Sequence, residues 1–235
     1  MIEYGETKTI AYAYDESGMI VGRVEASQEE HFYEKPHDYM SMFGQYRVVS
    51  AGYSVDLDFF EGSHDASRFS DAWNVFEEEF GDSEAADVFE RWVRIFWPMC
   101  PVVRRTLRTG YSQGDWVEVI AWCDTGTLKR EYQHLPVYEA ASTAAGVLRS
   151  DLEVMEAIAR HQFYCVTYTP ATVGEVTVTE DDGDTAYMRA TVEFSGVGDS
   201  VTTLAMSEFE PEAELLAVAD GFAPFEVYRF EAVAA

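Results

Sequence analysis

The hydrophobic pattern of the chain changes its period twice along 235 residues. Toward both ends, runs of β-branched and aromatic residues alternate with small or polar ones, which is typical of half-buried strands. Between them, apolar residues recur every three or four positions, as on one face of a helix. The pattern predicts an α+β fold with antiparallel sheets at both ends and a helical middle that contains one β-hairpin.

Three ranges follow from these changes of period. We expect an N-terminal β-rich part over 1–62, a helical middle over 63–162 with a hairpin over 101–124, and a C-terminal antiparallel β part over 163–235. No repeat or linker separates them, so a single domain agrees equally well with the pattern.

Serines mark the expected starts of the helices. Ser70 and Ser83 can each cap a helix, and Ser150 with Glu153 forms a capping box that predicts a new helix start. The expected helices cover 71–80, 84–97, 135–148 and 151–162. The clearest apolar stripe, which we expect in the core, comprises Ala85, Phe89, Trp92, Val93 and Phe96.

Strand-like runs dominate the C-terminal part. Asp182-Gly183 is a strong hairpin signal between two of them, and residues 211–221 predict a short helix before the last strand. The expected strands here cover 163–170, 174–180, 185–194, 200–209 and 225–232.

Charge is the strongest functional signal, because 16 basic residues against 43 acidic ones give a net charge of −27. Such an excess disfavours direct binding to nucleic acid or to an anionic membrane. In one interpretation the acid serves solubility or adaptation to salt. In the other it is a working surface for a basic protein, supplied by acid-rich segments. These segments are Glu77, Glu78 and Glu79; Asp181, Asp182 and Asp184; and Glu208, Glu210, Glu212 and Glu214.

A window without acids, residues 91–114, contains five arginines. Guanidinium groups match phosphate and carboxylate, so this window is a candidate anion site, with Ser112, Asp115 or His134 as reacting groups. Alternatively, the arginines pair with acids elsewhere or across a dimer. The five candidates are Arg91, Arg94, Arg104, Arg105 and Arg108.

The stretch "GYSQGD" at 110–115 matches G-x-S-x-G, the nucleophile elbow of α/β-hydrolases. The elbow needs a helix directly after its serine. Here "DWVEVIAWC" follows, which is rich in strand-favouring residues. We therefore predict a hairpin turn and no serine hydrolase.

Metal and cofactor motifs are absent from the sequence, and we predict neither. The histidines lack the H-E-x-x-H spacing, and no glycine-rich phosphate loop occurs. Cys100, Cys123 and Cys165 form no C-x-x-C pair and read as reduced thiols. With no signal pattern and no membrane-length apolar run, we expect a cytoplasmic protein that does not bind a membrane.

The segments "FERWVRIFWP", "GYSQGD" and "LRSDLEVMEAIARHQFYCVTY" occur in this order over about 85–170. Together they resemble uncharacterised proteins of bacteriophages and mobile elements, in which a helix rich in Trp and Arg leads to this turn. The later helix departs from their pattern, because it lacks a tyrosine or glycine at the expected place. The group has no assigned activity, so the resemblance supplies context only.

In that context the acidity is similar in kind to that of DNA-mimic antirestriction proteins. The resemblance implies an accessory protein that binds and inhibits a basic host protein, such as a defence nuclease or a CRISPR effector, at its nucleic-acid site. Two alternatives stay open. One is an enzyme or ligand-binding protein with an anion site at 91–114. The other is a structural or self-assembling protein, a homo-oligomer with Trp97 or Trp116 at its interface.

Overall fold

The computed structural model describes residues 5–28, 30–34, 39–40, 44–52, 58–60, 68–110, 114–181, 185–194, 201–206 and 229–232. Their helices and antiparallel strands confirm the α+β class, with two separate sheets. The chain divides into two compact units, which are described separately. Unit 1 comprises Met1–Glu30 with Gln162–Ala235, and unit 2 comprises His31–His161.

These units do not follow the three ranges expected from the sequence. Strands β1 (Thr7–Tyr14) and β2 (Ile20–Ser27) pair with each other, and β2 also pairs with β6 (Phe163–Asp181). Strand β3 (Gln45–Ala51), expected with the N-terminal strands, pairs with β5 (Trp116–Trp122) in unit 2. The pattern identified strands, but it holds no information on which strands pair across the chain.

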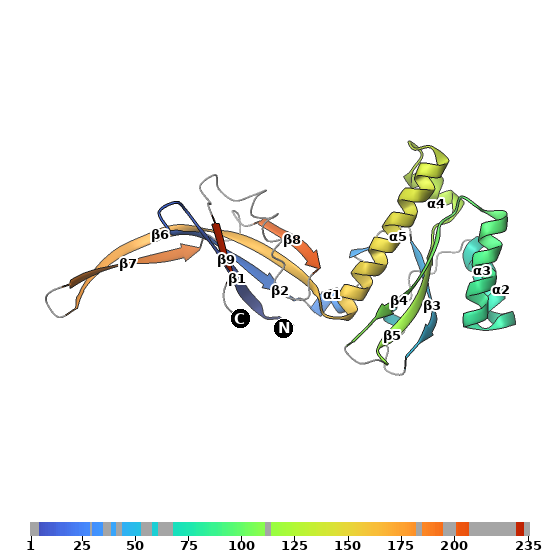
Figure 1. Cartoon of the computed structure of the whole chain (residues 1–235), viewed down its shortest axis with the longest axis horizontal. Coiled ribbons are helices and arrows are strands. Elements are labelled where there is room, and N and C mark those ends of the chain that lie inside the picture. Colours follow the sequence, from blue (N-terminus) through green and yellow to red (C-terminus); the bar gives the residue numbers. More distant parts are fainter. Residues whose placement is uncertain are drawn as a thin grey trace. The chain divides into compact units, whose positions relative to one another are not determined.

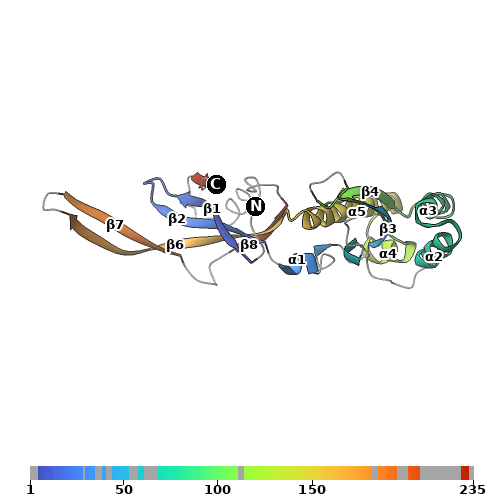
Figure 2. The same cartoon turned by 90° about the horizontal axis from the view of Figure 1, so that it is seen from below.

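The sheet of unit 1 has the order β7-β6-β2-β1-β9, with β8 also paired to β6. Strand β7 (Thr185–Phe194) pairs with the second half of β6, residues 171–181. Strand β8 (Val201–Met206) pairs with its first part, residues 163–168. Strands β6 and β7 extend together beyond the other strands (Figures 1 and 2). Strand β9 (Arg229–Ala232) pairs with β1.

Strand β6 joins two runs that we expected as separate strands, 163–170 and 174–180. Pro170 lies opposite Gly22 within the pairing, and the strand continues past it. Proline can occupy a strand position where no ladder hydrogen bond from its nitrogen is needed. The pairing of Asp181 with Thr185 confirms the hairpin. The turn at 182–184 and the expected helix at 211–221 lie outside the described residues.

Unit 2 has three layers (Figure 1). A sheet of order β3-β5-β4 lies in the middle, with β4 at Val102–Arg108. Helices α2 (Arg68–Phe80) and α3 (Asp82–Phe96) form an antiparallel hairpin on one face, and α5 (Val137–Ala159) covers the other. The short elements are α1 (Glu30–Glu34), η2 (Asp58–Phe60) and α4 (Thr125–Glu131).

Aromatic contacts hold the α2–α3 hairpin on the sheet. The ring of Trp122 on β5 lies 5.8 Å from that of Trp73 on α2 and 4.8 Å from that of Phe89 on α3. All three side chains are fully buried. The stripe expected in the core is confirmed at Ala85, Phe89 and Val93, whereas Phe96, at its far end, is 64 % exposed.

The serine caps that we expected are wrong. Ser70 lies inside α2, and its hydroxyl donates to Gln45 Oε1 at 2.8 Å, so a tertiary hydrogen bond uses the group expected to cap. Ser83 lies inside α3, whose N-cap is Gly81 with a φ of 76°. Glycine tolerates this left-handed conformation at little cost.

The capping box at Ser150 and Glu153 is also wrong, because α5 runs through it without a break. A single buried stripe, with Ala144, Leu148 and Leu152, continues across this point and packs toward β4. Tertiary packing thus decides the helix length. Helix α4 was missed, although Asp124 caps it by accepting from the Thr127 amide at 2.8 Å.

A buried hydrogen bond ties β3 to α5. The Tyr46 hydroxyl donates to Asp151 Oδ2 at 2.6 Å, and both residues are buried. Gly44 leaves room for this hydroxyl, since a Cβ at Gly44 would collide with it. A buried carboxylate needs such a donor to offset the loss of water.

We expect Tyr46→Phe to lower the free energy of unfolding of unit 2 by about 1–3 kcal/mol, because it removes a donor from the buried Asp151 carboxylate. Tyr138→Phe is the matched control, because among the described residues that hydroxyl bonds only to the neighbouring, exposed Glu139. Urea unfolding followed by tryptophan fluorescence measures both variants. Equal stability of the two would contradict the role of the Tyr46–Asp151 bond.

Among the helices in the described ranges, including the 23-residue α5, none is long and apolar enough to cross a membrane.

Candidate functional site

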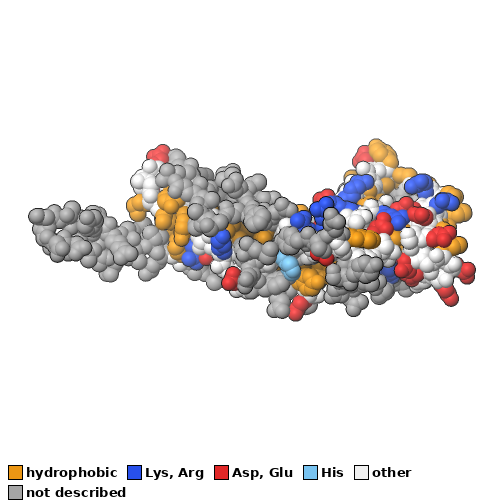
Figure 3. Space-filling view, turned by 60° about the horizontal axis from the view of Figure 1, so that its bottom comes forward, with side chains coloured by type: hydrophobic (Ala, Val, Ile, Leu, Met, Phe, Trp, Pro, Cys, Tyr) orange, Lys and Arg blue, Asp and Glu red, His pale blue; other side chains and the backbone are white. Residues whose placement is uncertain are grey.

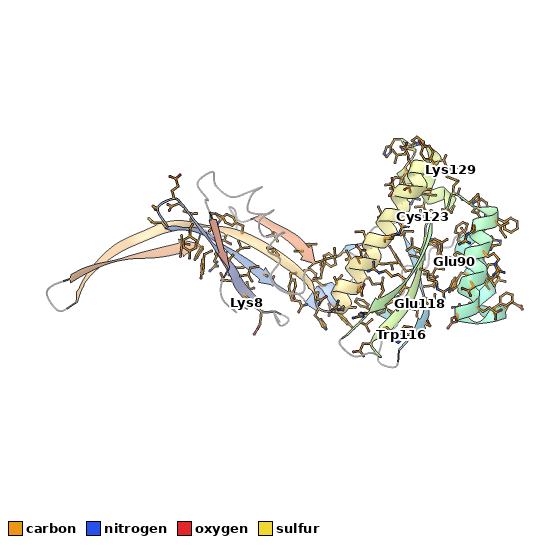
Figure 4. All side chains as sticks on the ribbon, viewed as in Figure 1. Lys8, Glu90, Trp116, Glu118, Cys123 and Lys129 are labelled. Atoms are coloured by element: carbon orange, nitrogen blue, oxygen red, sulfur yellow. The ribbon has the colours of Figure 1, made fainter. Side chains whose placement is uncertain are left out.

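Arg104 on β4 is held by two carboxylates on the face that α3 covers. Its Nε and Nη2 donate to Glu118 on β5 at 2.8 and 3.2 Å, and its Nη1 donates to Asp87 on α3 at 2.6 Å. The hydrogen bonds that Arg104 donates to Glu118 and Asp87 raise its pKa, although partial burial opposes them. Glu118 also accepts from the Ser50 hydroxyl on β3 at 3.0 Å, and Figure 4 labels it on β5.

Arg105 is held in the same way on the opposite face of the sheet. Its Nη1 donates to Glu153 at 2.9 Å and its Nη2 to Glu156 at 3.1 Å, both on α5. Glu156 also accepts from the backbone amide of Arg108 at 3.0 Å. The two neighbouring arginines therefore do not share one anion site.

The remaining arginines of the window are dispersed. Arg91 and Arg94 are exposed on α3, and Arg108 is exposed at the end of β4. For Arg104 and Arg105 the structure shows the pairing alternative rather than an open anion pocket. The sequence could have predicted this separation, because Arg104 and Arg105 are consecutive in a strand, and consecutive strand residues lie on opposite faces of the sheet.

We expect Arg104→Met to destabilise the protein by about 1–2 kcal/mol, since it leaves the half-buried Glu118 without its cation. Arg130→Met should leave stability unchanged, because within the described part of the chain Arg130 pairs only with the adjacent Glu131 at the surface. Thermal unfolding of both variants at neutral pH is the measurement. A harmless Arg104→Met would show that this ion pair is dispensable.

Antiparallel pairing of β4 with β5 confirms the predicted hairpin, and the "GYSQGD" stretch lies between these two strands in the sequence. The Thr109 amide donates to the Asp115 carbonyl at 2.9 Å, and β5 follows directly in place of a helix. Gly110 is needed because a Cβ there would collide with the Asp115 side chain. Residues 111–113, including Ser112, lie outside the described residues. His134 is exposed between α4 and α5, and Trp97 and Trp116 are half-buried.

The end of the hairpin at which α2 turns into α3 carries five carboxylates, and we call it the acidic end. They are Glu77, Glu78, Glu79, Asp82 and Glu84. All but the half-buried Glu77 are exposed. Glu77 accepts from the Trp73 indole at 3.3 Å. Within the described ranges no cation forms an ion pair with any of the five.

Helix electrostatics account for Asp82 and Glu84 but not for the three glutamates of α2. Acids in the first turn of α3 are favourable, whereas the three glutamates lie in the last turn of α2, which contains no base. Negative charge at a helix C-terminus typically costs about 0.3–1 kcal/mol per group. Of the other acidic candidates, Asp181 ends β6, and Asp182, Asp184 and Glu208, Glu210, Glu212 and Glu214 lie outside the described residues.

Exposed apolar residues on the same hairpin were not expected. Phe80 lies at the acidic end, and Val75 and Ile95 lie further along α2 and α3. Figure 3 shows apolar, acidic and basic side chains close together on one face of unit 2. The sequence could have indicated this exposure, because Val75 and Ile95 each lie two positions after a buried residue of the same helix, about 200° around it.

Cys100 and Cys123 are buried, which disfavours their thiolate forms. Burial raises the pKa of Cys100, and burial with the neighbouring Asp124 raises that of Cys123 to about 12. Figure 4 shows Cys123 just after β5. None of the three cysteines forms a disulfide. No group of three potential metal ligands occurs within the described part of the chain.

His161 follows α5 with a φ of 56° and stacks on Tyr33 at 5.8 Å between ring centroids. Burial lowers its pKa below 6.5. As the pH falls below 6.5, the unfolded chain takes up the proton first, so the stability that the neutral ring contributes is lost.

We therefore expect the stability cost of His161→Asn to be larger at pH 7.5 than at pH 5, because the wild-type protein loses the contribution of the neutral ring on acidification. Asparagine tolerates the left-handed backbone and does not titrate. Chemical unfolding across this range tests the effect. A pH-independent difference between the two proteins would contradict it.

Comparisons with protein-family models, curated proteins and solved structures gave no match.

Proposed function

We propose that the protein is a non-enzymatic binding protein that uses its acidic end to hold a basic partner protein. The observation that carries this proposal is the set of five carboxylates at 77–84, all but Glu77 exposed, which no described cation pairs. Carboxylates that only neutralise the chain's own arginines would be paired with them, as those around Arg104 and Arg105 are.

The partner class that fits best is a protein with a basic nucleic-acid groove, such as a defence nuclease or a CRISPR effector. A net charge of −27 steers the chain toward such a groove and away from nucleic acid itself. The acidic end would then occupy positions of the nucleic-acid phosphates. In this proposal the protein acts in the cytoplasm of the host cell as an accessory protein of a phage or mobile element, and it needs no cofactor.

An anion-binding enzyme at 91–114 is less well supported. The cations of Arg104 and Arg105 are each held by two carboxylates, on opposite faces of the sheet. A phosphorylated ligand would have to displace these carboxylates, and it could not engage both arginines at once.

The test is capture of partners from a host lysate on the immobilised protein, followed by release with duplex DNA. The variant Glu78→Gln/Glu79→Gln/Asp82→Asn/Glu84→Gln should reduce capture at least about tenfold, because four contact charges are lost. The control carries Glu6→Gln/Glu16→Gln/Glu34→Gln/Glu139→Gln. These four residues are exposed and lie elsewhere, so both variants have the same net charge.

Capture that is DNA-sensitive and lost only in the first variant supports the proposal. Equal loss in both variants would mean that bulk charge, not the acidic end, attracts the partner. Retention of no nucleic-acid enzyme would overturn the proposed partner class.

A further inference from the structure

We propose that the outer edge of β8 in unit 1 is a docking site for an extended, basic segment of a partner protein, which adds to the sheet as a further strand. The proposal goes beyond the proposed function, because it concerns another surface and needs no contribution from the acidic end. Three observations carry it: the free edge of β8, the lack of charged residues in this strand, and the acids that flank it in the sequence.

Strand β8 lies at an edge of its sheet. Residues 165–168 of β6 pair with β2 on one side and with β8 on the other, so the far side of β8 points away from the sheet. Among the described strands, β8 pairs only with β6. In an antiparallel strand every second residue points both its N–H and its C=O away from the neighbour, so β8 offers a row of donors and acceptors along its outer edge.

The strand that offers this edge is itself fixed in place. Ala205 is buried in the core of unit 1 together with Tyr164 and Val166 of β6. On the opposite face, the hydroxyl oxygens of Thr202 and Thr167 lie 3.0 Å apart. A segment that binds here would therefore not have to order β8 first, and this preorganisation lowers the entropic cost of binding.

Charged residues are absent from β8, whose sequence is "VTTLAM". Natural proteins usually protect edge strands against pairing with charged side chains, proline or bulges. The other strands at the edges of the two described sheets, β3, β4, β7 and β9, each contain at least one charged residue. The edge of β8 lacks a protection that these strands have.

The exposed face of β8 indicates which side chains an added strand should carry. Leu204 is 43 % exposed and Met206 is 42 % exposed, and both lie on the same face as the exposed Thr202. Side chains of neighbouring strands pair across a sheet face, so apolar residues at alternate positions of the added strand would cover Leu204 and Met206. Main-chain hydrogen bonds would hold the segment, and these side-chain contacts would select it.

Charge favours a basic segment over a second copy of the chain. Asp199 precedes β8 by two residues in the sequence, Glu208 follows it by two, and the whole chain has a net charge of −27. Two copies paired through β8 would bring acid-bearing ends together, whether the strands ran parallel or antiparallel. A strand with Lys or Arg at both ends would instead meet these ends favourably.

Amide hydrogen exchange of the full chain with a strand-forming probe is the experiment. The probe is a short peptide of alternating valine and threonine with two lysines at each end. The amides of β8 that point away from β6, every second one, should gain at least about tenfold protection. A peptide with glutamates in place of the lysines should give none. Equal protection by both peptides, or no protection in β8 by the lysine peptide, overturns the proposal.

Substitutions on the exposed face test the position of the site. Leu204→Lys and Thr202→Lys should each weaken binding of the lysine peptide at least about tenfold, because each adds a like charge and protects the edge. Met19→Lys is the matched control, because Met19 is 40 % exposed and lies between β1 and β2. Unweakened binding by both β8 variants, or equal weakening by Met19→Lys, overturns the assignment to β8.

Two further measurements separate this proposal from a second copy and from the acidic end. Sedimentation equilibrium should give the 26.5 kDa mass of one chain at about 100 μM. A dimer that Leu204→Lys abolishes would make a second copy the occupant and overturn the basic segment. The variant Glu78→Gln/Glu79→Gln/Asp82→Asn/Glu84→Gln should bind the lysine peptide at β8 as the wild type does, so loss of β8 protection in this variant also contradicts the proposal.

Discussion

The packing of Trp73 and Phe89 on Trp122 is the interaction on which the arrangement of unit 2 depends. One indole on β5 contacts both helices of the hairpin and donates its N–H to Gln45 on β3 at 2.9 Å. Gln45 in turn accepts from Ser70 on α2. Such aromatic pairs contribute about 0.5–1.5 kcal/mol each beyond their buried area. They also fix which side of each helix faces the sheet.

Once those sides are fixed, the remaining sides of α2 and α3 must face outward. The carboxylates at 77–84 then gather at one end of the hairpin, and Val75, Arg91 and Ile95 come to lie on its outer side. On the sheet, Arg104 and Arg105 each form two ion pairs with carboxylates of unit 2. The hairpin therefore carries exposed carboxylates that no described cation pairs, together with exposed apolar side chains.

The sequence predicted most element types but not their partners or limits. The hairpin at 101–124 was found because its strands and glycine-containing turn are local signals. The break expected at Ser150 was wrong because a local capping signal was weaker than a buried stripe that continues through it. The shared sheet of both chain ends could not be derived, because strand pairing over more than 100 residues leaves no local trace.

The candidate site was predicted in part. Glu77, Glu78 and Glu79 were identified from their charge, whereas Asp82 and Glu84, the next acids along the chain, were not included with them. The arginine window looked coherent because its residues are close in sequence. Strand alternation separates Arg104 from Arg105, and their glutamate partners on α5 lie about fifty residues away. Ile95 and Phe96 are exposed because the buried stripe of α3 ends at Val93. Sequence periodicity alone does not locate this end.

The most direct test of the acidic end as a binding surface is a chemical-shift map of the isotope-labelled full chain titrated with a short oligoarginine peptide. The account predicts that the largest shifts fall at residues 77–84, with little change at Glu153 and Glu156, which already hold Arg105. Shifts of similar size at all exposed acids, or centred on α5, would contradict it.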